Sequence, residues 1–372
     1  MFNDIRPYYD SEIASAMHRI ADSEFFPLLA SYVFPECDVE QVRELVRGID
    51  NIHDFQQKIM YKANCRIIEN SISELTYSGV ENISRSEQHL YVSNHRDIML
   101  DASLMQNILT DNGLDTTEIT FGANLMQGEI VVDIGKSNKM FRVERPSRNM
   151  REFYLASKHL SEYMRTTICN RGQSIWIAQR NGRSKDGLDR TDQGIINMFR
   201  MSGGGDKVAS IAELNILPVA VSYEWESCDI LKAVELFARS QGPYVKREGE
   251  DLNSILQGIL QYKGAVHFEF CKPITAEDLK PCEEMTSNEV NRFVALLIDQ
   301  RICSGYRLMS NNYIAHDMLS NGGEYSAHYT AAQREKFEEY LSRLDGFEHK
   351  QEIRDILLGI YANPVNSKNQ FL

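Results

Sequence analysis

The sequence predicts an α/β fold with a mixed, largely parallel sheet flanked by helices, and with helical extensions at both termini. From about residue 75 to about residue 275, short apolar runs alternate with turns and amphipathic segments, a pattern typical of strands joined by helices. On either side of this region, apolar residues recur at helical spacing. The chain has 372 residues, of which 42% are hydrophobic and 25% are charged, so it can bury a large core as an ordinary globular protein does.

Both ends of the chain are expected to be helical, as an N-terminal region of residues 1–62 and a C-terminal region of residues 276–372. In the first region, Ile13, Met17 and Ile20 follow one another at steps of three and four residues. In the second, helices are predicted at residues 288–302 and 331–361, and the Asn-Pro-Val-Asn tail at 363–366 is predicted to fray.

The most apolar stretch near the N-terminus, residues 25–34, is interrupted by Pro27 and is shorter than a bilayer requires. We expect a core helix there, with a surface that dips into lipid as the alternative. No run of eighteen apolar residues occurs in the sequence, so we expect no membrane span. The first residues show no basic segment followed by an apolar core, so we expect no signal peptide.

Residues 63–275 are expected to form the α/β domain. Buried strands are predicted where the chain is continuously apolar, at residues 90–92, 174–178, 216–221 and 265–270. Helices are predicted between them, at residues 151–165 and 188–201.

Charge and cysteine content restrict the functional classes. The formal net charge is −13, which argues against a protein that coats nucleic acid through bulk positive charge. The seven cysteines are scattered, with no Cys-x-x-Cys pair, so they fit neither a zinc site nor a disulfide framework. We therefore expect a protein of a reducing cytoplasm.

The most informative motif lies directly after the strand predicted at 90–92, where Asn94 and His95 are followed by the acids Asp97 and Asp101. A strand end can place an imidazole in a cleft, and a carboxylate on the next turn can orient it. A histidine held in this way can take a proton from a hydroxyl group near neutral pH. Such pairs are common, and a structural histidine explains this motif alone at least as well.

A second motif is a run of basic residues in an otherwise acidic chain. The six residues are Lys136, Lys139, Arg142, Arg145, Arg148 and Arg151. Guanidinium groups match phosphate oxygens with a fork of donors, so we predict an anion site here. Arg142 is the best single candidate, because Phe141 and Val143 flank it with apolar side chains. A solvated charged face, partly neutralised by Glu144 and Glu152, is the alternative.

The third motif is a polar turn directly after the strand predicted at 174–178. It contains Gly182, Arg183 and Lys185. Glycine lets the backbone approach a ligand closely, the two cations can hold an anionic group, and strand ends are where open α/β sheets place ligands. An ordinary glycine-rich turn is the alternative.

Together, the three motifs resemble those of the glycerolipid acyltransferase superfamily, which includes glycerol-3-phosphate and 1-acylglycerol-3-phosphate acyltransferases. The matching residues are Asn94, His95 and Asp101, then Phe141 and Arg142, then Gly182, Arg183 and Ser184, and finally the strand that contains Pro218. The resemblance covers roughly residues 75–275, and residues 5–10 look like bacterial members that lack membrane spans. It implies an α/β acyltransferase core with helical flanks.

The sequence departs from the family pattern at two positions. The family's Asp lies five positions after His, where this chain has Leu100. We favour Asp101 as the residue that orients His95, with Asp97 as the alternate. The family's Glu before Gly is Asn181 here, and an amide supplies no charge. Either the role of that acid is dispensable, or this chain has altered or weakened activity.

The resemblance implies an O-acyltransferase of phospholipid or glycerolipid biosynthesis. It would move a fatty acyl group from acyl-CoA or acyl carrier protein to a hydroxyl group of glycerol-3-phosphate or a lysophospholipid. His95 would be the general base, with no metal and no cofactor beyond the acyl co-substrate. The expected substrate-binding residues are Asn94, Phe141, Arg142, Arg145, Asn181, Gly182, Arg183, Ser184, Lys185 and Pro218.

The resemblance also implies where such a protein works. A phosphorylated glycerolipid acceptor places it at the inner face of the cytoplasmic membrane, as a cytoplasmic protein attached peripherally, with no nucleic-acid partner. A non-catalytic acyl-lipid-binding or regulatory relative of the same fold is the alternative that Asn181 and the displaced Asp keep open. A kinase is improbable, because the position five residues after Asp97 is Ala102 rather than a metal-binding Asn.

Overall fold

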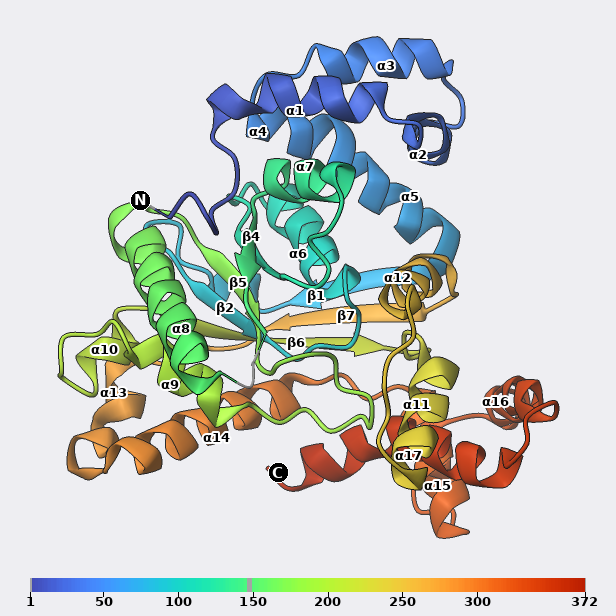
Figure 1. The fold of residues 1–372 in the computed structure, drawn as a ribbon. Coiled ribbons are helices and arrows are strands. Elements are labelled where there is room, and N and C mark those ends of the chain that lie inside the picture. The colour runs from blue at the N-terminus through green and yellow to red at the C-terminus, as the bar shows by residue number, and fades with distance from the viewer. Residues whose placement is uncertain (1, 146–148, 372) are drawn as a thin grey trace.

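A seven-stranded sheet forms the centre of the computed structural model, which describes residues 2–145 and 149–371. The strand order is β1-β7-β6-β2-β5-β3-β4 (Figure 1). The strands are β1 (Ile72–Ser78), β2 (Leu90–Ser93), β3 (Glu118–Gly122), β4 (Met140–Val143), β5 (Ile175–Ala178), β6 (Ile216–Tyr223) and β7 (Gly264–Phe270).

Neighbouring strands in this sheet run parallel, with one exception. β6 and β7 are antiparallel, whereas β7 is parallel to β1 and β6 is parallel to β2. The remaining pairs, from β2 through β5 and β3 to β4, are parallel as well. The predicted α/β class with a mixed, largely parallel sheet is confirmed. Parallel strands bring their carboxyl ends to one edge of the sheet, which is where ligands bind in such folds.

Three of the strands are not predicted from the sequence. β1 and β4 are the edge strands of the sheet, and polar residues interrupt their pattern. Most of β1 is exposed or half-buried, and β4 has only four residues, one of which is Arg142. β3 begins at Glu118, a buried carboxylate that pairs with Arg171 at 3.0 Å. Acidic residues are depleted in strands, so a segment that begins with Glu118 does not read as the start of a strand in the sequence.

Helices cover both faces of the sheet and extend the chain at both ends (Figure 1). The α-helices are α1 (Asp10–Asp22), α2 (Phe26–Val33), α3 (Val39–Arg47), α4 (Ile52–Phe55), α5 (Tyr61–Ser71), α6 (Leu100–Asp111), α7 (Glu129–Ser137), α8 (Met150–Arg165), α9 (Gln193–Arg200), α10 (Ala209–Ala212), α11 (Asp229–Gln241), α12 (Glu250–Leu260), α13 (Ala276–Leu279), α14 (Ser287–Gly305), α15 (Ser310–Ser320), α16 (Ala331–Leu341) and α17 (Lys350–Asn369). Shorter 3-10 or π segments are η1 (Gln56–Met60), η2 (Val80–Asn82), η3 (Thr166–Asn170), η4 (Lys280–Glu284), η5 (Ser326–His328) and η6 (Ser342–Leu344). Within the described ranges, none of these helices is both long and apolar enough to cross a membrane.

Alternating side chains of the strands build a core on each face of the sheet. Leu90 and Val92 of β2 pack in the core that α8, α9 and α14 cover, while Tyr91 packs in the core that α6 covers. Because both faces of these strands are buried, the strands read as continuous apolar runs in the sequence.

The helices α1 to α5 form a bundle with its own apolar core, at the top of Figure 1. Arg19 of α1 donates to the carboxylate of Asp133 in α7 at 2.7 Å, and Tyr8 donates to the same carboxylate at 2.8 Å. These polar contacts fix the bundle to the helices of the sheet. The expected boundary between residues 62 and 63 falls within α5, and the division of the chain into three regions stays a prediction.

The C-terminal helices differ from the sequence prediction in three ways, the first of which is that α15 is not among the predicted helices. The helix predicted at 331–361 is two helices, α16 and α17, separated by a turn that contains Gly346. The predicted fraying at 363–366 is wrong, because α17 continues to Asn369 and Val365 is fully buried. Asn363 also donates to the carbonyl oxygen of Asp186 at 2.7 Å. Tertiary contacts with the third motif therefore outweigh the helix-breaking tendency of Pro364.

Candidate active site

Asn94 holds the corner that follows β2. Its Oδ1 accepts from the backbone N–H of Val221 at 2.7 Å, and its Nδ2 donates to the carbonyl oxygen of the same residue at 2.9 Å. Nδ2 also donates to Oδ2 of Asp189 at 3.1 Å. The sequence predicts that Asn94 binds substrate, but its fully buried amide is used inside the fold. It ties the end of β2 to β6 and so positions the residue that follows.

That residue, His95, lies at the wall of a cavity. Its Nδ1 is 2.9 Å from Oδ2 of Asp101, in the first turn of α6. The His95 side chain is 14% exposed, whereas that of Asp101 is fully buried. With Nδ1 bonded to the carboxylate, Nε2 is the ring nitrogen available for chemistry.

Asp101 is fixed by three further donors. Its Oδ2 accepts from the backbone N–H groups of Arg96 at 2.7 Å and Asp97 at 2.9 Å. Its Oδ1 accepts from the hydroxyl group of Tyr223 at 2.8 Å. Burial raises the pKa of Tyr223 well above its ordinary value, so the phenol keeps its proton and remains a donor. A carboxylate held in this way fixes both the orientation and the tautomer of His95.

Asp97, the alternate orienting acid, has other partners. Its Oδ1 accepts from the backbone N–H groups of Met99 at 2.8 Å and Leu100 at 2.9 Å, at the start of α6. Its Oδ2 accepts from the hydroxyl group of Ser227. The geometry therefore favours Asp101 as the partner of His95.

A buried network of charges lies behind the His95 corner. The Arg96 guanidinium, which is fully buried, pairs with Asp189 at 2.6 Å and with Glu226 at 3.3 Å. Lys232 pairs with Glu226 at 2.6 Å and donates to the carbonyl oxygen of Arg96 at 2.7 Å. Burial alone lowers the pKa of Arg96, but the two carboxylates raise it above its ordinary value. The network joins the His95 corner to the loop after β5 and to the start of α11.

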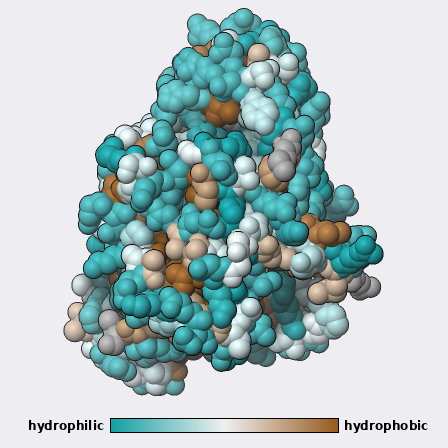
Figure 2. All heavy atoms as spheres, turned by 90° about the vertical axis from the view of Figure 1, so that its left-hand side faces the viewer, coloured by the Kyte–Doolittle hydropathy of each residue, from teal (hydrophilic) through white to brown (hydrophobic). Residues whose placement is uncertain are grey.

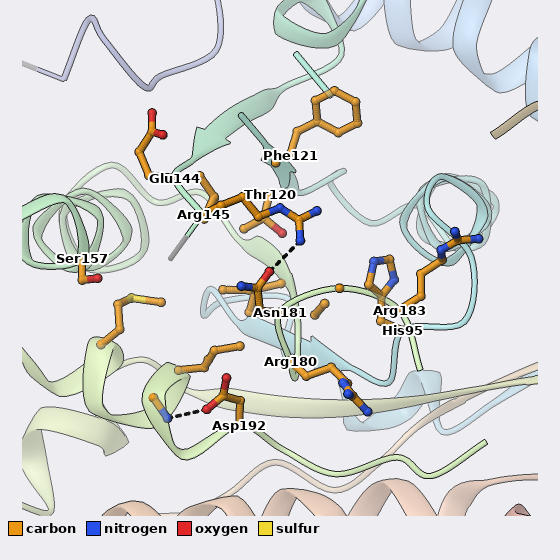
Figure 3. Close-up of a pocket in the computed structure, with 18 of the residues that line it drawn as sticks. His95, Thr120, Phe121, Glu144, Arg145, Ser157, Arg180, Asn181, Arg183 and Asp192 are labelled. Atoms are coloured by element: carbon orange, nitrogen blue, oxygen red, sulfur yellow. Dashed lines mark hydrogen bonds between the residues drawn. The ribbon is translucent and has the colours of Figure 1, made fainter. Parts of the chain in front are cut away.

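A cavity of about 650 Å³ opens beside His95, where β2, β3, β4 and β5 end. Figure 3 shows the polar residues that surround it. Part of its wall is apolar and comes from the sheet, α8 and α9: Val143, Phe153, Leu160, Ile177, Ile195, Met198 and Met201. Another part is polar: Arg145, Arg180, Asn181, Gly182, Arg183 and Lys185. Such a wall suits a molecule with an apolar chain and a charged head group.

The polar part of the wall centres on the turn after β5. Arg145 donates to Oδ1 of Asn181 and to Oδ1 of Asn124, both at 2.8 Å, and the first of these bonds is drawn in Figure 3. Gly182 has a φ of 80°, a left-handed conformation that a side chain would strain. The turn therefore needs glycine, and Arg145 and Asn181 hold it from the side.

Arg183 brings an unused donor to this turn. Its Nη1 is buried and has no hydrogen-bond partner within residues 2–145 and 149–371. Buried donors are nearly always paired, so this nitrogen is well suited to bind an anionic group of a ligand. Both His95 and Arg183 line the cavity, as Figure 3 shows.

Two predicted binding residues of β4 lie away from the cavity. Phe141 is fully buried and packs against Tyr163, with ring centroids 5.1 Å apart. The Arg142 side chain is 44% exposed and pairs with Glu144 at 2.7 Å. Because side chains alternate along a strand, Arg142 lies on the face opposite Val143, which lines the cavity. Of the second motif, Arg145 reaches the cavity, and Arg148 lies outside the described residues.

Ser184 and Pro218 are also structural in position. The backbone N–H of Ser184 donates to the carbonyl oxygen of His95 at 2.7 Å, and its buried hydroxyl group donates to the carbonyl oxygen of Leu188 at 3.1 Å. Pro218 is buried in β6, opposite Val92. Ser184 thus joins the third motif to the His95 corner, although neither side chain lines the cavity.

Lys185 lines the cavity and forms an ion pair with Glu235 of α11. Burial lowers the pKa of Lys185. The cation therefore has a carboxylate partner already. Among the described residues, no group of three or more His, Cys, Asp or Glu side chains could hold a metal ion, and the absence of a cofactor stays a prediction.

Several residues of the candidate site are not predicted from the sequence. Trp176 of β5 meets His95 in a T-shaped arrangement, with ring centroids 6.0 Å apart, and Tyr154 and Arg180 also line the cavity. Arg180 lies beside the third motif, so its proximity to that motif is a signal. Tyr223 gives no local signal, because its partner Asp101 is distant in the sequence.

Residues 74–222 match the model of the Acyltransferase family. This part of the chain is similar to that family. The match runs from β1 into β6 and includes the cavity side of the sheet with His95, Asp101 and Arg183. A similar solved structure is that of the 1-acyl-sn-glycerophosphate (LPA) acyltransferase PlsC from Thermotoga maritima, with 14% identity, a TM-score of 0.39, and coverage of 79% of this chain and 95% of that chain. Comparison of the chain with curated proteins finds no match.

Proposed function

We propose that this acyltransferase moves a fatty acyl group from an acyl thioester to a hydroxyl group of a phosphorylated glycerolipid acceptor. The observation that carries the proposal is the His95–Asp101 pair, 2.9 Å apart, at a cavity with an apolar wall and a buried guanidinium nitrogen of Arg183 that has no hydrogen-bond partner among the described residues. A base, an anion-binding group and room for an acyl chain are the parts that this reaction requires.

In the proposed mechanism, His95 acts as the general base. Its Nε2 takes the proton of the acceptor hydroxyl group while the oxygen attacks the carbonyl carbon of the thioester. Asp101 keeps the proton on Nδ1 and stabilises the imidazolium, and donors near the Gly182 turn stabilise the oxyanion. The C–S bond then breaks, and the imidazolium returns its proton to the departing thiolate. The products are an ester and a free thiol.

Arg183 and Arg145 are the proposed binding groups for the phosphate of the acceptor, since a guanidinium donates to phosphate oxygens through a planar fork. The apolar wall formed by α8, α9 and the sheet is the proposed site of the acyl chain. The resemblance of the three motifs to glycerolipid acyltransferases supports glycerol-3-phosphate or a lysophospholipid as acceptor, and acyl-CoA or acyl carrier protein as donor. It also supports a cytoplasmic protein that works peripherally at a membrane.

Incubation of the purified protein with labelled acyl-CoA or labelled acyl carrier protein tests the proposal. The acceptors are glycerol-3-phosphate, lysophosphatidic acid and a lyso-aminolipid, each offered separately. We expect a labelled lipid with a phosphorylated acceptor, and the product identifies that acceptor. Tight binding of acyl-CoA without any product would contradict the proposal and would support a non-catalytic acyl-lipid-binding relative.

A further inference from the structure

The first turns of α8 present a surface that mixes apolar and basic side chains. Met150, Tyr154 and Leu155 are 74%, 57% and 55% exposed. Arg151 and Lys158 are exposed as well. Apolar side chains that gather on one exposed face are a sign of a surface that another body covers. We refer to these five residues as the α8 rim.

Helical geometry places the five residues on one side of α8. Successive residues lie about 100° apart around the helix axis, so Met150, Tyr154 and Lys158, at steps of four, form one stripe. Arg151 and Leu155 form the adjacent stripe. The buried residues come from the second half of the helix: Leu160, Ser161, Tyr163 and Met164.

The α8 rim is continuous with the cavity. Met150 and Tyr154 line the cavity as well as the surface, together with Phe153 and Ser157 of the same helix. Figure 2, which looks onto the side where α8 lies in Figure 1, shows apolar side chains gathered among hydrophilic ones on this face. An apolar chain that enters the cavity past α8 therefore crosses apolar side chains at its edge.

We propose that the α8 rim docks the protein on an anionic lipid bilayer, with the cavity opening toward the lipid. This inference rests on the proposed function, because the lipid acceptor enters and leaves at the same edge. Leu155 and Met150 suit the boundary between head groups and acyl chains, and Tyr154 has the amphipathic ring that is enriched there.

The charge distribution of the chain favours an anionic bilayer as the partner of the α8 rim. The whole chain has a net charge of −13, so an anionic surface repels most of the molecule and attracts it only where cations gather. Arg151 and Lys158 provide such cations at the rim. Glu152 is exposed as well, but it lies about 100° further around the helix than Arg151 and so outside both stripes. Lys158 is 3.9 Å from Glu162, but both side chains are nearly half exposed, so the ammonium group can still meet lipid head groups.

Co-sedimentation of the full chain with vesicles of phosphatidylcholine and phosphatidylglycerol tests the proposal. Leu155→Glu is the test variant, since Leu155 is exposed and does not line the cavity. Leu296→Glu is its matched control, because Leu296 of α14 is 53% exposed and lies outside the α8 rim. We expect Leu155→Glu to weaken binding about tenfold or more, and Leu296→Glu to bind like the parent protein. Equal binding by both variants would overturn the proposal.

A second pair of measurements separates charge from apolar contact. We expect Arg151→Gln to weaken binding to vesicles that contain phosphatidylglycerol, and to leave binding to pure phosphatidylcholine vesicles unchanged. Equal loss with both kinds of vesicle would contradict an electrostatic role for Arg151 at an anionic surface.

Activity without vesicles distinguishes failure of docking from failure of the proposed function. With a soluble short-chain acyl-CoA and glycerol-3-phosphate, we expect Leu155→Glu to match the parent kcat/KM. If the parent itself shows no turnover with any acceptor, the proposed function fails, while vesicle binding still tests the α8 rim. If Leu155→Glu impairs transfer only from acyl carrier protein and leaves vesicle binding unchanged, the surface binds an acidic protein and the bilayer proposal is wrong.

Discussion

Tyr223 donates a hydrogen bond of 2.8 Å to Oδ1 of Asp101, the carboxylate whose other oxygen holds Nδ1 of His95. This hydrogen bond links the end of β6 to the first turn of α6, and Asp101 in turn links that turn to the corner after β2. All three groups are in the protein interior or at the cavity wall. The orientation of the proposed base thus depends on a residue that never meets the substrate.

Replacement of Tyr223 by Phe removes this donor and keeps the aromatic ring. A single hydrogen bond to a charged group contributes about 1.5–3 kcal/mol, so we expect kcat to fall about tenfold or more with little change in KM. Because the Asp101 carboxylate then has one donor fewer, it attracts the imidazolium of His95 more strongly, so the acidic limb of the kcat profile should move to higher pH. Measurement of kcat and KM across pH checks both effects. An unchanged acidic limb would show that Tyr223 only fills space.

Arg183→Gln should weaken binding of the phosphorylated acceptor. Loss of a charge-assisted hydrogen bond of about 1.5–3 kcal/mol corresponds to a rise in KM for that acceptor of roughly 10- to 100-fold, with a smaller change in kcat. Arg142→Gln is the matched control, because Arg142 is exposed and does not line the cavity. Steady-state kinetics with varied acceptor concentration give both values. If Arg142→Gln raises this KM and Arg183→Gln does not, the assignment of the anion site is wrong.

The sequence predicts the central strands, and it singles out several residues that the structure brings to one cavity, because both leave local signals. The strands near His95 are buried on both faces and read as continuous apolar runs, and His95, Asp101, Gly182 and Arg183 stand beside strand ends. The edge strands β1 and β4 and the course of α17 depend on contacts between distant segments, such as the bond from Asn363 to Asp186. Local propensity cannot show these contacts.

Contacts between distant segments also decide which residues of the candidate site the sequence can predict. The sequence favours Arg142 over Arg145. Only the three-dimensional arrangement shows that Val143 faces the cavity, so that Arg142, the preceding strand residue, faces away from it. It also gives no reason to expect that Asn94 is enclosed by β6, since its partner Val221 is far along the chain. In contrast, the preference for Asp101 over Asp97 agrees with the geometry of the His95 pair.

The stability of the fold should depend on pH through Asp299 of α14. Burial raises the pKa of Asp299 from 3.8 to about 6, although Thr191 donates to its carboxylate. Because the pKa is higher in the folded than in the unfolded state, this residue favours folding most below pH 4, and the contribution is lost as the pH rises through about 6. Asp299→Asn keeps an acceptor oxygen and removes the titration.

We therefore expect Asp299→Asn to gain stability relative to the parent between about pH 4 and pH 6, by up to about 3 kcal/mol. Urea unfolding of both proteins at several pH values measures the difference. A constant difference across this range would contradict the assignment of the pH dependence to Asp299.

The most direct test of the central claim is the turnover rate of His95→Ala, with the acyl donor and acceptor on which the parent protein acts and with circular dichroism to confirm that the variant is folded. Positioned proton transfer contributes about 10²–10⁴-fold to rate, so we predict a loss of kcat of that size. A folded His95→Ala variant that transfers the acyl group at the parent rate would contradict the account of His95 as the base that Asp101 and Tyr223 hold in place.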